Sequence, residues 1–292
     1  MIDFVGIGAP KSGSTWLSKC LEEHPQILFS STKSRKELAF FNDTNPWGDS
    51  DDTYFSYYTK GFDWYLKQFP EAEQDKVRGE FTVLYMADPV APARIKKHLP
   101  NTKIVAILRN PIEVIYSLHW FFHYGAVLDV PKKFSDTLKK GLFLEVGFYY
   151  KQLKRYYELF DKDKIHIILF DDFKASTTAE LEKLYSFLGV DPKFTPLSLN
   201  KSINSSYRTR SALLKKMGHS VFRTVNKSNS HNLKMLIMSQ KKLHKLYSFL
   251  NKEKASYPPI GPDEKKFLQQ LYRDDIEQLE KLINRDLSMW KA

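Results

Sequence analysis

The sequence predicts an α/β fold in which helices flank a mainly parallel central sheet. Short apolar runs alternate with amphipathic stretches along the chain, which is the pattern of strands joined through helices. Two runs, KIVAIL at Lys103–Leu108 and IHIILF at Ile165–Phe170, are apolar without interruption, as parallel strands buried on both faces are. A tight turn near the N-terminus, Ala9–Thr15, separates a further apolar run from an amphipathic stretch.

The elements of the N-terminal half follow from these patterns. Asp3–Ile7 is expected to form the first strand, and Thr15–Glu23 the helix after the turn. Asn110-Pro111 interrupts the chain after the KIVAIL strand. Because proline fits the first turn of a helix, the next helix is expected to begin there and to end near Phe122.

The C-terminal half is richer in helices. Helices are expected at Gly147–Phe160, at Thr177–Leu188, where Gly189 ends the helix, and at Asp263–Leu282. Residues 191–211 are expected to form a loop, because they hold two prolines and a polar run. No stretch reads clearly as a linker, so residues 1–292 are predicted to form a single domain with a basic helical part at about 208–254.

Length and composition set further limits. With 292 residues, of which 42% are hydrophobic, the chain can bury a substantial core, and this composition excludes general disorder. Cys20 is the only cysteine, so no disulfide can form within the chain. The N-terminus lacks the basic and apolar regions of a signal peptide, and no apolar run reaches the length of about 18 residues expected of a membrane span. A cytoplasmic location is the resulting expectation.

The positive charge is concentrated in one segment. Residues 208–254 carry twelve Lys and Arg and one acidic residue, Glu253, which gives +11 and equals the net charge of the whole chain. Solvated helix faces explain this most simply. Attraction to an anionic acceptor or to a membrane surface is the alternative. Nucleic acid is not expected as a partner, because nothing else in the chain resembles a nucleic-acid module.

The turn that follows the first strand has the chemistry of an anion site. The first backbone N–H groups of a helix are unpaired and carry a partial positive charge, and this turn leads directly into a helix. Gly13 lets the backbone approach an anion closely, and Lys11 adds a full charge. The hydroxyls of Ser12, Ser14 and Thr15 add donors. The sequence therefore predicts a phosphate or sulfate site here.

The turn differs from the phosphate loop of nucleoside triphosphatases. Gly8 and Gly13 have the spacing of that loop, G-x-x-x-x-G-K-[ST], but Ser14 and Thr15 stand where its lysine and hydroxyl residue belong. The lysine of this turn instead comes two residues before Gly13. A magnesium-dependent nucleotide kinase or NTPase is therefore only the alternative, with Asp171 after the IHIILF strand as its candidate magnesium ligand.

The turn resembles that of the PAPS-dependent sulfotransferases, which use 3′-phosphoadenosine 5′-phosphosulfate. Their 5′-phosphosulfate loop reads PK[ST]G[ST][ST], and Pro10–Thr15 reads PKSGST. The resemblance implies the P-loop-like sulfotransferase fold, with PAPS as co-substrate. It also implies that the 5′ side of PAPS is bound by Lys11, Ser12, Gly13, Ser14, Thr15 and Trp16.

A second element of the family binds the 3′-phosphate through an arginine at the end of a strand and a serine eight residues later. The stretch KIVAILRNPIEVIYS supplies Arg109 and Ser117 at that spacing. An arginine at the carboxyl end of a strand can hold a phosphate through two hydrogen bonds. A later loop with Tyr207, Arg208 and Arg210 is the candidate for further donor contacts, and a solvated basic loop explains it equally well.

The chain is more similar to the glycan-modifying and bacterial sulfotransferases than to the cytosolic small-molecule branch. Lys36–Phe41 carries the E-x-x-FF pattern of the glycan branch, and Lys60–Tyr65 its Gly-x-x-Trp-Tyr pattern. Two features differ from that branch. Phe81 replaces the lysine of its Gly-Glu-Lys pattern, and a single cysteine cannot form its C-terminal disulfide. Both differences count against a heparan-type acceptor.

The resemblance also assigns catalytic roles. It implies that Glu37 is the general base that takes the proton of the acceptor, and that Lys11 stabilises the leaving phosphate. His98, read as the end of a helix, and His119, read as a packing residue, are the rival bases. In-line displacement of this kind needs no metal, and the histidines form no pattern of metal ligands.

The sequence leaves the acceptor and the oligomeric state open. A sugar, a lipid or a small metabolite with a hydroxyl or an amine would fit, and the aromatic residues between 54 and 65 could line its site or belong to the core. A non-enzymatic adaptor that binds anions or membranes through residues 208–254 is the remaining alternative. That alternative leaves Lys11 and Arg109 unexplained.

Overall fold

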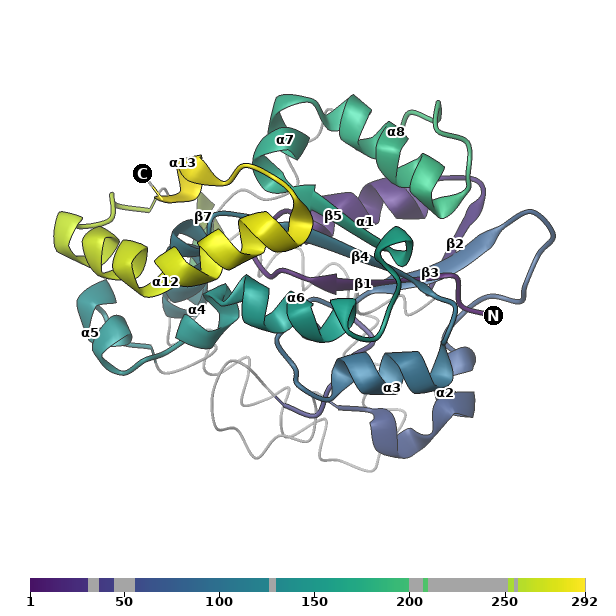
Figure 1. The fold of residues 1–292 in the computed structure, drawn as a ribbon, viewed down its shortest axis with the longest axis horizontal. Coiled ribbons are helices and arrows are strands. Elements are labelled where there is room, and N and C mark those ends of the chain that lie inside the picture. The colour runs from purple at the N-terminus through teal and green to yellow at the C-terminus, as the bar shows by residue number, and fades with distance from the viewer. Residues whose placement is uncertain are drawn as a thin grey trace.

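The computed structural model describes residues 1–30, 37–44, 56–125, 130–199, 207–209, 252–254 and 257–291. At its centre lies a five-stranded, all-parallel sheet with the strand order β2-β3-β1-β4-β5 (Figure 1). The strands are β1 (Phe4–Gly8), β2 (Ile27–Phe29), β3 (Val77–Phe81), β4 (Lys103–Leu108) and β5 (Ile165–Leu169). The predicted α/β fold with a parallel sheet is therefore confirmed.

Helices cover both faces of the sheet (Figure 1). One face carries α1 (Ser14–Glu23), α7 (Phe170–Ala175) and α8 (Thr177–Leu188). The other face carries α3 (Ala91–His98), α4 (Pro111–Gly125), α6 (Tyr149–Tyr157) and α12 (Pro262–Ile283). The shorter helices are α2 (Phe62–Leu66), α5 (Phe134–Lys139) and α13 (Ser288–Lys291). None of the helices described is long and apolar enough to cross a membrane.

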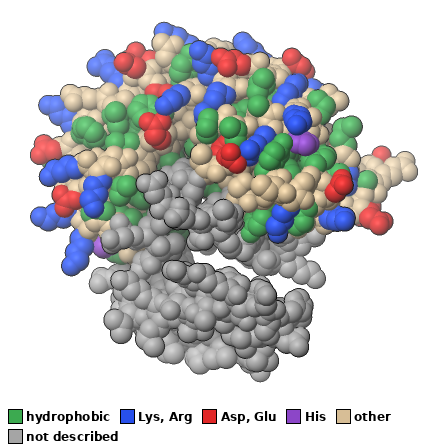
Figure 2. Space-filling model, turned by 90° about the horizontal axis from the view of Figure 1, so that it is seen from below, with side chains coloured by type: hydrophobic (Ala, Val, Ile, Leu, Met, Phe, Trp, Pro, Cys, Tyr) green, Lys and Arg blue, Asp and Glu red, His purple; other side chains and the backbone are tan. Residues whose placement is uncertain are grey.

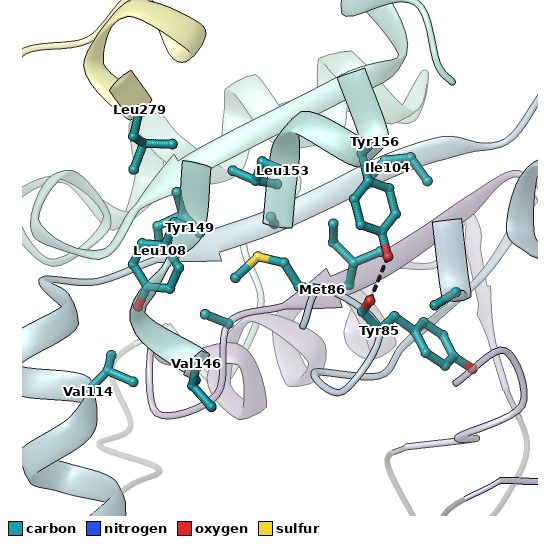
Figure 3. Packing of buried hydrophobic residues seen from close by; sticks show 14 of the residues in the cluster. Tyr85, Met86, Ile104, Leu108, Val114, Val146, Tyr149, Leu153, Tyr156 and Leu279 are labelled. Carbon is teal, nitrogen blue, oxygen red and sulfur yellow. Dashed lines mark hydrogen bonds between the residues drawn. The ribbon is translucent and has the colours of Figure 1, made fainter. Parts of the chain in front are cut away.

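The two faces bury separate hydrophobic clusters, and alternation along the strands assigns each side chain to one of them. In β4, Ile104, Ala106 and Leu108 belong to the cluster under α3, α4, α6 and α12. Val105 and Ile107 of the same strand face α1, α7 and α8. This is the period of two that a strand imposes on its side chains. Figure 3 shows part of the larger cluster, in which the hydroxyl of Tyr156 donates to the Tyr85 carbonyl at 2.8 Å.

Most expected elements of the described chain are present, with shifted ends. The helix expected to start at Gly147 begins as α6 at Tyr149, after a 3₁₀ turn at Leu144–Gly147. Phe170 does not end a strand as expected, because it is the first residue of α7. The strands β2 and β3 were not predicted.

The segment 208–254 lies almost entirely outside the described residues, and so do the helices expected in it. Its two described ends belong to β6 (Tyr207–Thr209) and β7 (Lys252–Lys254), which pair antiparallel. Strand β6 lies beside α4. Tyr207–Thr209, expected to lie in a loop, therefore form a strand next to α4, the helix that follows β4.

Candidate functional site

The candidate site lies at the carboxyl ends of β1 and β4, which are neighbours in the sheet. After β1 the chain enters α1 on one face of the sheet, and after β4 it enters α4 on the opposite face. Two neighbouring parallel strands whose connections leave in opposite directions open a crevice at their carboxyl ends. Ligands of α/β proteins bind at this place.

The turn between β1 and α1 depends on two residues with left-handed backbone. Lys11 has φ 58° and Gly13 has φ 88°. A Cβ atom on Gly13 would also lie only 3.0 Å from the ring of Phe170, so glycine is required there for space as well as for conformation. Residues that alternate in this way turn successive N–H groups toward one point, as anion-binding nests do.

The first amides of α1 and the side-chain hydroxyls of the turn differ in their surroundings. The amides of Trp16 and Leu17 both donate to the Gly13 carbonyl, and the amides that precede them belong to the unpaired first turn of α1. The side chains of Ser12 and Ser14 are buried, and the Ser12 hydroxyl donates to the Pro10 carbonyl at 3.3 Å. Thr15 alone among the three predicted hydroxyl donors is exposed.

Lys11 is a partly buried cation. Its Nζ lies 4.2 Å from the centre of the Phe121 ring. Burial, and secondarily the charge of Arg109, lowers the pKa of Lys11 to about 8. A bound anion beside Lys11 would raise this pKa again, because a nearby negative charge favours the protonated form.

Arg109 follows β4 and reaches back to the turn. One Nη donates to the Lys11 carbonyl at 3.3 Å, so the two predicted cations are brought together. The guanidinium is also paired with Glu113 on α4, with a 2.6 Å contact, and lies over Phe170. Glu113 is half-exposed, which makes this pair weak and easy to exchange for a phosphate.

The backbone of Arg109 is fixed from below. Tyr149 of α6 is fully buried and donates its hydroxyl to the Arg109 carbonyl at 3.0 Å. The side chain of Ser12 lies close enough to the same hydroxyl to lower its pKa, against the larger effect of burial, which raises it. One tyrosine therefore joins the turn after β1 to the end of β4.

Ser117 and Trp16, both predicted to contact PAPS, lie in different surroundings. Ser117 lies on α4, nearly buried, on the helix beside β6. The indole of Trp16 points away from the turn, because its N–H donates to the Ser198 carbonyl at 2.9 Å and its ring packs on Phe173. This placement favours a packing role for Trp16. The side chains of Tyr207 and Arg208, and all of Arg210, lie outside the described residues.

Glu37 lies beside the carboxyl end of β3, the other neighbour of β1 in the sheet. The amide of the next residue, Leu38, donates to the hydroxyl of Thr82, the first residue after β3. The charge of Glu37 is close enough to raise the pKa of the buried Glu80. Glu37, Lys11 and Arg109 thus lie beside the carboxyl ends of three adjacent strands, β3, β1 and β4.

The rival bases are placed less favourably. His98 ends α3, next to the amino end of β4, and stacks on Phe62 at 4.6 Å. The length of β4, roughly 20 Å for six residues, separates that end from Arg109. His119 is fully buried, with Nδ1 on the Thr137 hydroxyl, and burial lowers its pKa to about 4. Among the residues that the structure describes, its Nε2 has no hydrogen-bond partner.

Phe81 occupies the position where the glycan-modifying family carries a lysine. Its ring is fully buried in the cluster under α1, α7 and α8. A Cβ atom on Gly6 would lie 2.1 Å from that ring, so glycine in β1 makes room for it. No cation can stand at position 81 without disrupting this packing.

Asp171, the candidate magnesium ligand of the kinase alternative, is engaged elsewhere. Its Oδ2 accepts a hydrogen bond from the indole N–H of Trp290 at 3.0 Å. Asp172 is paired with Arg285. Within the described ranges, no group of three His, Cys, Asp or Glu side chains is arranged to hold a metal ion.

Sequence reasoning missed four residues that shape this site. The sequence could have indicated Glu113, because oppositely charged residues four apart at the start of a helix often pair, and Glu113 is four residues after Arg109. The other three are joined to the site only by the fold, and no local pattern indicates them: Tyr149, Phe170 and Glu80.

Comparisons with known proteins concern the family and the fold of the chain. A family model described as a sulfotransferase domain matches residues 2–282. The bifunctional heparan sulfate N-deacetylase/N-sulfotransferase 3 of Mus musculus is 27% identical over 303 residues, which cover 97% of this chain and 30% of that protein. A membrane-associated sulfotransferase of Dictyostelium discoideum is 35% identical over 122 residues, which cover 41% of this chain and 22% of that protein. The chain thus spans less than a third of the length of either relative.

Solved structures share the fold. A sulfotransferase from Alicyclobacillus acidocaldarius superposes with a TM-score of 0.70 at 21% identity, covering 100% of this chain and 99% of its own. A mouse sulfotransferase complexed with PAP superposes with a TM-score of 0.52 at 18% identity, covering 94% of this chain and 84% of its own.

Proposed function

Because the chain belongs to the sulfotransferase domain family, we propose that it transfers a sulfuryl group from PAPS to a hydroxyl or amine acceptor. One observation carries the proposal: the guanidinium of Arg109 donates to the carbonyl of Lys11, so the ends of β1 and β4 present two cations beside a helix N-terminus. A donor with one phosphate at each end of its ribose needs such a pair of anion sites.

The proposed reaction is an in-line displacement, in which the acceptor oxygen or nitrogen bonds to sulfur as the bond from sulfur to the bridging phosphate oxygen breaks. Glu37 takes the proton that the acceptor loses. Lys11 and the amides of residues 12–15 stabilise the negative charge that grows on the 5′-phosphate. Arg109 and Ser117 hold the 3′-phosphate, with Tyr207, Arg208 and Arg210 as further candidates.

The acceptor class is a separate proposal. Aromatic side chains gather next to the Glu37 segment, where the Phe40 ring lies 5.4 Å from Tyr58 and 6.2 Å from Trp64. Phe40 is fully buried, whereas Tyr58 and Trp64 are half-buried, and half-buried aromatic rings suit a sugar ring or another apolar acceptor face. We propose a glycan, lipid or small-metabolite acceptor that approaches from this side.

Contact with a membrane surface through residues 208–254 is a weaker proposal. On the face shown in Figure 2, basic and acidic side chains are interspersed over the described residues. A mixed surface gives little attraction to anions. We place the attraction in the basic segment, whose twelve Lys and Arg stand against one acidic residue, while the rest of the chain is balanced in charge.

The donor is tested by ligand-dependent stability. PAP, the desulfated product of PAPS, is expected to raise the melting temperature, because a ligand that binds only the folded state stabilises it. ATP with magnesium is expected to do so much less, since it lacks the 3′-phosphate that Arg109 is proposed to bind. Strong stabilisation by ATP with magnesium, and none by PAP, would favour the kinase alternative instead.

Lys11 gives the binding reaction a pH dependence. The pKa of about 8 means that Lys11 is partly neutral above that pH in the free protein, whereas a bound phosphate favours the charged form. PAP affinity is therefore expected to be nearly constant from about pH 7, where the phosphates are doubly charged, up to this pKa, and to fall as the pH rises through it. Calorimetry just above pH 8, in two buffers of different ionisation enthalpy, should detect proton uptake on binding. The Lys11→Arg variant keeps its charge and should bind without uptake; equal uptake in both proteins would contradict this role.

A further inference from the structure

Beneath the segment that carries Glu37 lies one completely buried carboxylate, Glu80 of β3. Its Oε1 accepts hydrogen bonds from the hydroxyls of Tyr85 at 2.8 Å and Tyr65 at 3.1 Å. Its Oε2 accepts one from the hydroxyl of Thr82 at 2.6 Å. Three hydroxyl donors from two parts of the chain therefore converge on one side chain.

Two of these donors also hold the segment that follows Glu37. The oxygen of Thr82 accepts the amides of Leu38 at 3.0 Å and Ala39 at 3.3 Å. The oxygen of Tyr85 accepts the amide of Phe40 at 2.9 Å. A hydroxyl that donates to a carboxylate becomes a better acceptor, so Glu80 strengthens each of these bonds. Every amide from residue 38 to residue 40 is thus bound through a hydroxyl to Glu80.

The segment needs such support. Ala39 has φ 50°, a left-handed conformation that costs energy for any residue with a Cβ atom. The Tyr85 backbone is fixed on its far side by the hydroxyl of Tyr156 of α6, so the Tyr85 side chain extends from a rigid base (Figure 3). The pKa of Glu80 is raised to about 7, because burial and the charge of Glu37 raise it more than the three hydroxyls lower it. The effect of Glu37 indicates that the two carboxylates lie near each other.

We propose that Glu80 is a positioning residue for the general base. Through Thr82 and Tyr85 it fixes the backbone of residues 38–40, and this backbone sets where the Glu37 carboxylate meets the acceptor. The proposal deepens the proposed function and rests on it for the role of Glu37. Tyr65 bonds to the same carboxylate, but the amides of residues 38–40 donate to Thr82 and Tyr85 and not to its hydroxyl. Its ring packs on Phe40 with centroids 4.8 Å apart, so Tyr65→Phe, which keeps the ring and removes only the hydroxyl, is a matched control.

The first test needs neither donor nor acceptor. Hydrogen exchange of the amides of residues 38–40 is measured in Tyr85→Phe, Thr82→Val and Glu80→Gln. Exchange should accelerate by about tenfold or more in all three, because a lost hydrogen bond leaves these amides free to open. Thr82→Ser keeps the hydroxyl and should restore slow exchange, and Tyr65→Phe should leave it near the wild-type rate. Equal exchange in Tyr65→Phe and Tyr85→Phe, or no acceleration in Thr82→Val, would overturn the proposal.

The second test separates positioning from loss of the fold. With an identified acceptor, kcat should fall about tenfold in Thr82→Val and recover in Thr82→Ser, while calorimetry finds PAP affinity unchanged because Lys11 and Arg109 are intact. Wild-type kcat in Thr82→Val, or an equal loss of PAP affinity, would contradict a role through Glu37. The two tests distinguish the two proposals. If the chain transfers no sulfuryl group but Glu80 does hold residues 38–40, the exchange pattern is still observed. If Glu80 does not hold these residues, the exchange pattern is absent although the protein still binds PAP.

Discussion

Replacement of Glu37 by glutamine is expected to lower kcat by about a hundredfold or more, the usual contribution of a general base. Glutamine keeps the shape of the side chain and removes its basicity. PAP affinity should stay near wild type, because donor binding depends on Lys11, Arg109 and the amides of the turn, which leave the ends of other strands. Steady-state kinetics with an identified acceptor and calorimetry with PAP measure the two quantities.

A matched control for this variant is Glu22→Gln. Glu22 is an exposed carboxylate on α1 that pairs with Lys19, and its neutralisation should leave kcat unchanged. Near-normal turnover in Glu37→Gln would remove Glu37 from the mechanism. His119 would then be the next base to test, because its lowered pKa keeps it neutral and its Nε2 has no hydrogen-bond partner in the described part of the chain. His98 would follow.

Arg109→Ala is expected to weaken PAP binding by about ten- to a hundredfold, the range for a hydrogen bond to a charged group. The same change should cost a 5′-monophosphate much less, since that ligand lacks the 3′-phosphate. Isothermal titration of both nucleotides to wild type and variant gives the comparison. Equal losses for the two ligands would show that Arg109 does not distinguish the 3′ position.

Glu113→Gln controls for an indirect effect of Arg109. Glu113 holds the guanidinium in the absence of ligand, yet its negative charge also repels a phosphate at the same place. Because the pair is half-exposed, its loss should tighten PAP binding only slightly, by about two- to fivefold. A large loss of affinity in Glu113→Gln would mean that orientation by Glu113, more than the charge of Arg109, is what the site requires.

The fold was predictable where burial is continuous along the sequence. β4 and β5 are covered on both faces, so their apolar runs stand out. β2 has three residues, and β3 reads VRGEF with two charged residues, so neither carries such a run. The burial of Glu80 within β3 depends on Tyr65, fifteen residues away, and on hydroxyls that follow the strand. Local patterns do not contain that information.

The site was predictable where its parts are local. The turn of residues 10–15 is a short motif between a strand and a helix, and its geometry follows from Gly13 and the helix N-terminus. The meeting of Lys11 with Arg109 spans 98 residues and follows from the pairing of β1 with β4. The burial of the Ser12 and Ser14 side chains was not predictable, because a sequence does not show which way a turn directs them, and their contact with the donor stays a prediction.

Transfer of label from PAPS is the most direct test of the central claim. The protein is incubated with PAPS labelled in its sulfuryl group and with pools of glycans, lipids and small hydroxyl or amine metabolites. We expect label to enter at least one pool and PAP to form in equal amount, and we expect Lys11→Ala to abolish both. No label transfer with any pool, together with an absence of PAP binding, would contradict the central claim.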